Sequence, residues 1–111
     1  MNTVKTDNLK WNEGAVVNKT ASVANGIALD FTEADNKLVV LFENTSTKTK
    51  ATVEAGTGIQ ATNNIEIDLE GSKTTGVCLE SGSFKKMNGE NKGKIVVKAP
   101  TTVNITVIKL P

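Results

Sequence analysis

Hydrophobic and polar residues alternate with a period of two along much of the chain. In residues 48–55, the charged side chains of Lys48, Lys50 and Glu54 fall on one face, and small or aliphatic residues fall on the other. In residues 64–70, Ile and Leu alternate with carboxylates in the same way. Such alternation predicts strands with one face buried and one face in water. If these two strands pair, Lys48 and Lys50 face the acidic row of the second strand, where they set register more than stability.

The same pattern and the Gly, Asn and Ser turn signals predict further strands. The expected strands lie at residues 26–31, 37–43, 48–55, 64–70, 76–80, 94–98 and 103–110, with a shorter one at 15–17. Residues 37–43 are apolar on both faces, which predicts a central strand covered on both sides. Helical periodicity is missing, apart from a single turn expected at 32–35. Strands at intervals of about 8 to 12 residues are typical of a sandwich or a barrel.

We therefore predict an all-β fold, a two-layer antiparallel sandwich of about seven or eight strands, with a jelly roll as the alternative. Residues 1–111 are expected to form a single domain, because a chain of 111 residues suffices for one core. Cys78 lies between Val77 and Leu79, and we expect it to be a small buried hydrophobe. The predicted core comprises Ile27, Leu29, Phe31, Leu38, Val40, Phe42, Val53, Ile65, Ile67, Leu69, Val77, Leu79, Phe84, Ile95, Val97, Ile105 and Val107.

The types of charged residue present restrict the possible functions more than the net charge of +1 does. All 13 basic residues are Lys, and the chain has no Arg, His or Tyr. Arg is the side chain best suited to phosphate and base-edge contacts, and His is the commonest general base. An AT-rich coding sequence would explain the missing Arg better than the missing His. These absences argue against nucleic-acid readout and against acid–base catalysis.

Candidate catalytic and metal-binding groups are few. Glu66 and Asp68 share one strand face about 7 Å apart, a separation that suits glycoside hydrolysis. However, the aromatic content of 4% leaves few sugar platforms, and a solvated strand face is the better interpretation. The same carboxylates lack the Asp-x-Asp-x-Asp-Gly spacing of a calcium loop. We predict a protein that is not an enzyme and carries no cofactor or metal.

The chain is expected to be made in a cytoplasm and not secreted, because its first ten residues contain no apolar signal segment. The longest apolar run, residues 38–42, is far shorter than the roughly 20 residues of a transmembrane helix. We therefore predict no membrane association.

Six short segments between residues 37 and 111 resemble a group of short tailed-phage proteins of the head-gene region. The segments are an apolar strand ending in an Asn-Thr turn, a Thr-Val strand closing on Ala-Gly, a Gly-Ile-Gln loop, an Ile/Leu strand, a Leu-Glu-Ser-x-x-Phe segment and a terminal Leu-Pro. They lie at Val39–Ser46, Ala51–Gly56, Gly58–Gln60, Ile65–Leu69, Leu79–Phe84 and Ile108–Pro111. Where those proteins carry an Arg before the Phe, this chain has Ser83, and nothing functional carries over from that position.

The resemblance implies a phage virion protein, a capsid decoration or head accessory protein with an immunoglobulin-like sandwich. Its partner would be the phage capsid or another virion protein, and a homo-oligomer and a monomer are both compatible with the sequence. For docking, we predict that residues 1–12 form an extended arm that adds to a neighbouring sheet edge, with Val4, Leu9 and Trp11 as anchors. Trp11 could instead close one end of the sandwich. The alternative function is a small module for ligand or surface recognition, such as carbohydrate binding, which would need clustered aromatic residues.

Overall fold

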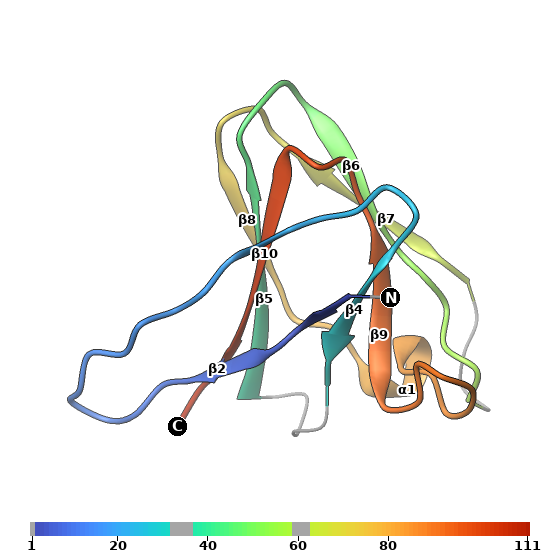
Figure 1. Cartoon of the computed structure of the whole chain (residues 1–111), viewed down its shortest axis with the longest axis horizontal. Helices are drawn as coiled ribbons and strands as arrows, with labels where there is room; N and C mark the ends of the chain where they lie inside the picture. The colour runs from blue at the N-terminus through green and yellow to red at the C-terminus, as the bar shows by residue number, and fades with distance from the viewer. Residues whose placement is uncertain (1, 32–36, 59–62) are drawn as a thin grey trace.

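Two mixed β-sheets pack face to face in the computed structural model, which describes residues 2–31, 37–58 and 63–111 (Figure 1). The first sheet has the spatial order β1 (Thr3–Val4), β4 (Ile27–Asp30), β9 (Lys94–Lys98), β6 (Thr49–Val53) and β7 (Ile65–Leu69). The second has the order β2 (Thr6–Asn8), β10 (Val103–Lys109), β5 (Leu38–Asn44) and β8 (Thr74–Val77), and β3 (Thr20–Ala21) also pairs with β10. One short helix, α1 (Ser81–Phe84), precedes β9. The predicted all-β sandwich is confirmed at this level, whereas the helical turn expected at 32–35 lies outside the described residues.

The sheets are not wholly antiparallel, which corrects the sequence-based prediction. β1 pairs with β4 in parallel, and β2 pairs with β10 in parallel. In Figure 1 the N-terminal segment (dark blue) passes from the side of β4 to the side of β10, so it joins both sheets. Parallel neighbours need long connections between them. The connection from β1 to β4 runs through β2 and β3, and the connection from β2 to β10 includes nearly the whole chain. Strand periodicity alone could not reveal that these pairs are parallel.

The predicted core is largely correct. Most of its residues are buried between the sheets, joined by Val4, Ala51, Ala99 and Val103. Ile67 and Val77 are only partly buried. Ile65 is 37% exposed, contrary to the prediction. Exposure falls along β7 from Ile65 through Ile67 to Leu69. β7 is the edge strand of its sheet, and Asn44 of the second sheet donates to the carbonyl at its Leu69 end.

Three further local predictions were wrong. Cys78 is exposed: it follows β8, another edge strand, and alternation points it away from the face that buries Leu79. β5 is interior to its sheet, but only alternate residues of it are buried, so one of its faces remains partly open. Residues 15–17 form no strand and lie in an exposed loop.

The pairing of the two alternating strands is confirmed. β6 and β7 pair antiparallel, with Lys50 opposite Asp68. Lys50 lies 3.1 Å from Glu66 and 4.0 Å from Asp68, and Lys48 lies 3.6 Å from Glu70. All five side chains are more than half exposed, so the ladder contributes little to stability and mainly favours this register.

Candidate docking surface

A long loop between β2 and β3, residues 9–19, carries three exposed apolar side chains, and two of them are the most exposed large apolar side chains of the described residues. We call it the tryptophan loop. Trp11 is 77% exposed, Val16 83% and Val17 45%. Figure 1 shows the loop (blue) extending away from both sheets at the lower left. Exposed apolar groups gathered on one projecting element are typical of a protein-docking surface, and Trp is the residue most enriched at interface hot spots.

Both ends of the tryptophan loop are attached to the same strand, β10. On one side, β2 runs parallel to β10, and the Leu9 N–H extends the pairing by donating to the Lys109 carbonyl at 2.9 Å. On the other side, β3 runs antiparallel to the first half of β10. The loop is therefore fixed at both ends to a strand whose inward side chains lie in the core.

Polar contacts close the neck of the loop. The backbone N–H of Asn18 donates to the Asp7 carboxylate at 2.7 Å, and the Asn18 side chain donates to the other carboxylate oxygen at 3.4 Å. Next to this clamp, Lys19 donates to Glu43 of β5 at 2.9 Å. This hydrogen bond, with a second one from Asn104, lowers the pKa of the Glu43 carboxyl. The loop is thus tied to two strands of the second sheet.

The turn that presents Trp11 has a locally favourable sequence. Asn12 adopts the left-handed backbone conformation, with φ of 59°, which Asn tolerates better than most residues. Gly14 follows in open space, with no atom within 4 Å of the position that a Cβ would occupy. A tight turn at Trp11–Asn12 leaves the indole in solvent and away from the core.

The structure does not bring Val4, Leu9 and Trp11 together on one surface. Val4 is 1% exposed and lies in the core, paired with Leu29 of β4. Leu9 is half-buried at the base of the loop, and only Trp11 presents an exposed side chain. The segment predicted to be an arm hydrogen-bonds through β1 and β2 to the sheets of its own chain. Partner binding by these three residues stays a prediction, and the side chain of Val4 is already occupied within the fold.

Sequence reasoning missed Val16 and Val17 as surface residues because a short apolar pair also fits a strand. The sequence did contain a sign of a loop at this point. The two residues follow Glu13 and Gly14, and the apolar segment is shorter than any other predicted strand. Trp11, Val16 and Val17 together give this one loop three exposed apolar side chains.

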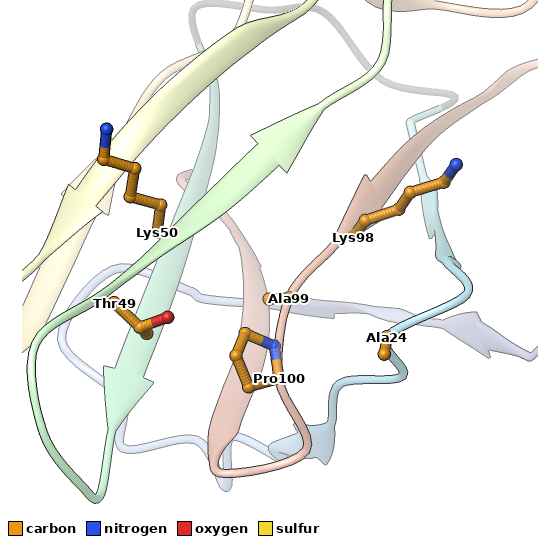
Figure 2. Close-up of a pocket in the computed structure, with 6 residues that line it drawn as sticks. All are labelled: Ala24, Thr49, Lys50, Lys98, Ala99 and Pro100. Atoms are coloured by element: carbon orange, nitrogen blue, oxygen red, sulfur yellow. The ribbon is translucent and has the colours of Figure 1, made fainter.

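A shallow pocket lies on another part of the molecule, where β6 passes the connection between β9 and β10. Its volume is about 520 Å³, and we call it the proline pocket. It is lined by Ala24, Thr49, Lys50, Lys98, Ala99 and Pro100. Figure 2 shows Ala99 and Pro100 between the two lysines, whose ammonium groups diverge. The lysine stems therefore contribute apolar walls while the charges remain at the rim.

Both rim lysines are held by carboxylates of the first sheet. Lys50 donates to Glu66, which raises the pKa of the Lys50 ammonium. Glu54 lies 3.1 Å from Lys98 and 3.3 Å from Lys86. Partial burial raises the pKa of Glu54, but the hydrogen bonds from Lys98 and Lys86 outweigh it, and the pKa is below its ordinary value. The rim is therefore preorganised with its positive charges spread on opposite sides.

Among residues 2–31, 37–58 and 63–111, no three His, Cys, Asp or Glu side chains are grouped as a metal site would require. Within the same ranges, no helix is long and apolar enough to span a bilayer. The carboxylates that the sequence singled out, Glu66 and Asp68, are instead engaged by Lys50.

Comparisons of the chain with models of protein families, with curated proteins and with solved structures find no match. A functional assignment therefore depends on the geometry of the tryptophan loop and of the proline pocket.

Proposed function

We propose that the chain is a non-catalytic structural protein of a tailed-phage virion, a capsid decoration or head accessory protein that docks on the capsid surface. The observation that carries this proposal is the tryptophan loop: a 77% exposed Trp11 on a loop tied at both ends to β10. A docking element that is already ordered loses less conformational entropy on binding than a free arm does. The resemblance of residues 37–111 to short head-region phage proteins supplies the biological setting.

The neighbour pattern of the strands supports the finer proposal of an immunoglobulin-like sandwich. In that fold, strands A, B and E are neighbours in one sheet, and strands C and F are neighbours in the other. Here β1, β4 and β9 are successive neighbours, and so are β10 and β5. The place of strand G beside F would be taken by β2 and β3. Two features depart from that fold: the chain order of the segment β6 to β8, and the parallel pairing of β1 with β4, since immunoglobulin-like sheets are antiparallel.

This arrangement assigns a role to the N-terminal segment. β2 and β3 cover the edge of β10 in two halves, parallel in one and antiparallel in the other. An uncovered sheet edge is a site for unwanted strand addition. The chain that leaves and returns to this edge forms the tryptophan loop, so edge protection and docking would be provided by one segment.

Cosedimentation with purified empty capsid shells tests the proposal. We expect a major capsid gene beside the gene of this chain; the shells are assembled from its product, and the wild type is expected to pellet with them at a saturating ratio. Trp11→Ala should weaken binding by about tenfold or more, as truncation of a hot-spot Trp does. Met87→Ala is the matched control, because Met87 is also an exposed apolar residue (55%) but lies outside the loop. Absence of wild-type binding, or equal binding of all three proteins, would refute docking through this loop.

A further inference from the structure

Two Asn-Gly pairs occur in the chain, at Asn25–Gly26 and at Asn88–Gly89. An Asn that precedes Gly can react with its own backbone: the peptide nitrogen of the Gly attacks the side-chain carbonyl carbon of the Asn and closes a five-membered ring. Gly favours this attack because it has no Cβ to obstruct the ring and allows the backbone to rotate. Both pairs therefore have a reactive sequence, and the fold decides which of them reacts.

Asn88–Gly89 lies in a turn between α1 and β9, residues 88–92, which we call the asparagine turn. Figure 1 shows this turn (orange) at the lower right, beside α1 and near the start of β9. Asn88 and Gly89 are both exposed, and no described atom lies within 4 Å of the position that a Cβ of Gly89 would occupy. Within the described residues, the Gly89 N–H donates to no backbone carbonyl. The attacking nitrogen is therefore accessible and unrestrained in the folded protein.

The fold protects Asn25–Gly26 from the same reaction. Asn25 is exposed, but Gly26 is buried. The Gly26 N–H donates to the Val23 carbonyl at 3.0 Å, and the next residue, Ile27, begins β4 and is fully buried. Ring formation here would break that hydrogen bond and rotate the backbone at the start of a core strand, which requires local unfolding.

We propose that Asn88 is a self-modification site, at which the folded protein converts its own asparagine to a mixture of aspartate and isoaspartate. The Gly89 nitrogen loses its proton and bonds to the Asn88 side-chain carbonyl carbon. The bond from that carbon to the amide nitrogen breaks, and the amide leaves as ammonia with the proton. Water then opens the succinimide ring, either at the former side-chain carbonyl, which gives aspartate, or at the backbone carbonyl, which gives isoaspartate. The reaction consumes only water and needs no partner, so it holds whether or not the chain docks on a capsid.

Both products add a negative charge to a basic hairpin. Residues 85–94 contain four lysines and one glutamate, a net charge of +3 that falls to +2. The net charge of the whole chain falls from +1 to zero. The conversion is irreversible, so this surface of the protein becomes less basic with time.

The structural change is confined to the turn. Isoaspartate lengthens the backbone by one atom next to Gly89, whose carbonyl accepts a hydrogen bond of 3.2 Å from the Lys92 N–H. The two arms of the hairpin are held outside this segment. The Lys86 N–H donates to the Lys94 carbonyl at 2.8 Å, and the Gly93 N–H donates to the Lys86 carbonyl at 2.8 Å. The sandwich therefore stays folded while the turn is remodelled.

The test compares the two Asn-Gly pairs within one molecule. The full chain is incubated in mildly alkaline buffer, which favours loss of the peptide proton, and is sampled over several weeks. Trypsin places the two pairs on separate peptides, residues 20–37 and 87–92, and mass spectrometry with fragmentation distinguishes Asn88 from Asn91. We expect Asn88 to convert at least about tenfold faster than Asn25, because only Asn25 needs local unfolding. In guanidinium chloride the two rates should become comparable, since the unfolded chain retains only the shared Asn-Gly sequence.

Three variants at exposed positions complete the test. Asn88→Gln should abolish the conversion in the turn, because its longer side chain would have to close a larger ring. Asn25→Gln is the matched control and should leave the rate at Asn88 unchanged. Asn88→Asp supplies the charge of the product, and it should elute from a cation-exchange column with the acidic form that the wild type accumulates. Circular dichroism checks that each variant is folded.

Three results would overturn the inference. The first is an Asn88 that stays intact in the folded chain. The second is an Asn25 that converts as fast as Asn88 without denaturant. The third is an unchanged ratio of the two rates in guanidinium chloride, which would show that the neighbouring sequence and not the fold causes the difference.

Discussion

Asp7 accepts a hydrogen bond of 2.7 Å from the backbone N–H of Asn18, across the neck of an eleven-residue excursion from the second sheet. Asp7 lies in β2, just before the tryptophan loop, and Asn18 lies near the end of the loop, two residues before β3. The contact holds the ends of the loop together, so that an exposed Trp is presented from a closed base and not from a free tail.

Removal of this contact is predicted to loosen the loop while the sandwich stays folded. In Asp7→Ala, the Asn18 N–H loses its acceptor, and we expect trypsin to cut after Lys10 or Lys19 severalfold faster than in the wild type. Asn18→Ala is the matched control, because it keeps the 2.7 Å backbone bond and loses only the 3.4 Å side-chain bond. It should change the cleavage rate much less. Equal rates in all three proteins would show that Asp7 does not restrain the loop.

Asn44 is predicted to be the most sensitive polar residue of the described core. It is 1% exposed, and its side-chain NH₂ lies 2.8 Å from the Thr47 carbonyl and within 3.3 Å of the carbonyls of Leu69 and Glu70. Asn44→Ala leaves these buried acceptors without their donor, which we expect to cost about 2 kcal/mol of the free energy of unfolding. Urea denaturation measures the loss. Asn63→Ala, at an exposed position, should change stability by less than about 0.5 kcal/mol.

The ion pairs of Glu54 are predicted to make stability depend on pH in the acid range. The folded-state pKa of Glu54 is lowered from its ordinary value of 4.5, so the contribution is present above that value and is lost as pH falls through the folded-state pKa. Glu54→Gln should therefore be less stable than the wild type at pH 7, by about 1 kcal/mol. The difference should disappear in strong acid.

Urea midpoints at neutral and acid pH check this prediction. Glu66→Gln is the control, because its partner Lys50 is more than half exposed and such pairs contribute little. If Glu54→Gln remains less stable than the wild type by the same amount in strong acid, the ion pairs of Glu54 are not the cause of the difference.

Gly56 is predicted to tolerate no side chain. A Cβ at this position would lie 2.5 Å from the Lys85 carbonyl oxygen and 2.9 Å from the Phe84 carbonyl carbon. Both are backbone atoms, and the Gly56 N–H also donates to the Ser83 carbonyl at 2.8 Å. Gly56→Ala must separate the two segments, and we expect a loss of about 1–3 kcal/mol.

Gly14 offers the matched control for Gly56. A Cβ at Gly14 meets no atom within 4 Å, so Gly14→Ala should leave the unfolding temperature nearly unchanged or slightly raised. If both variants melt alike, the close approach at Gly56 does not limit packing.

Alternation with a period of two located the segments of β4 to β10, whereas it missed β1, β2 and β3 and placed at residues 15–17 a strand that the structure lacks. The segments around Leu38–Phe42, Ile65–Leu69 and Ile95–Val97 were located within a few residues, because alternation reflects the two faces of a strand and is visible locally. The pairing of Lys48 and Lys50 with an acidic row followed from the same property. The candidate site was less accessible: Trp11 was singled out by its residue type, whereas Val16 and Val17 were assigned to a strand.

By itself, the sequence determined that the chain is built from strands, where most of them run and which side chains face inward, since these depend on residues close together in the chain. Only the tertiary structure decided that Thr3–Asn8 pairs in parallel with both sheets, that Ile65 and Cys78 lie on uncovered edges, and that residues 9–19 project. It alone joined Ala24, Thr49 and Pro100 into one pocket. These outcomes depend on which strand ends at an edge and which part of one sheet covers the other, and such contacts join residues far apart in sequence.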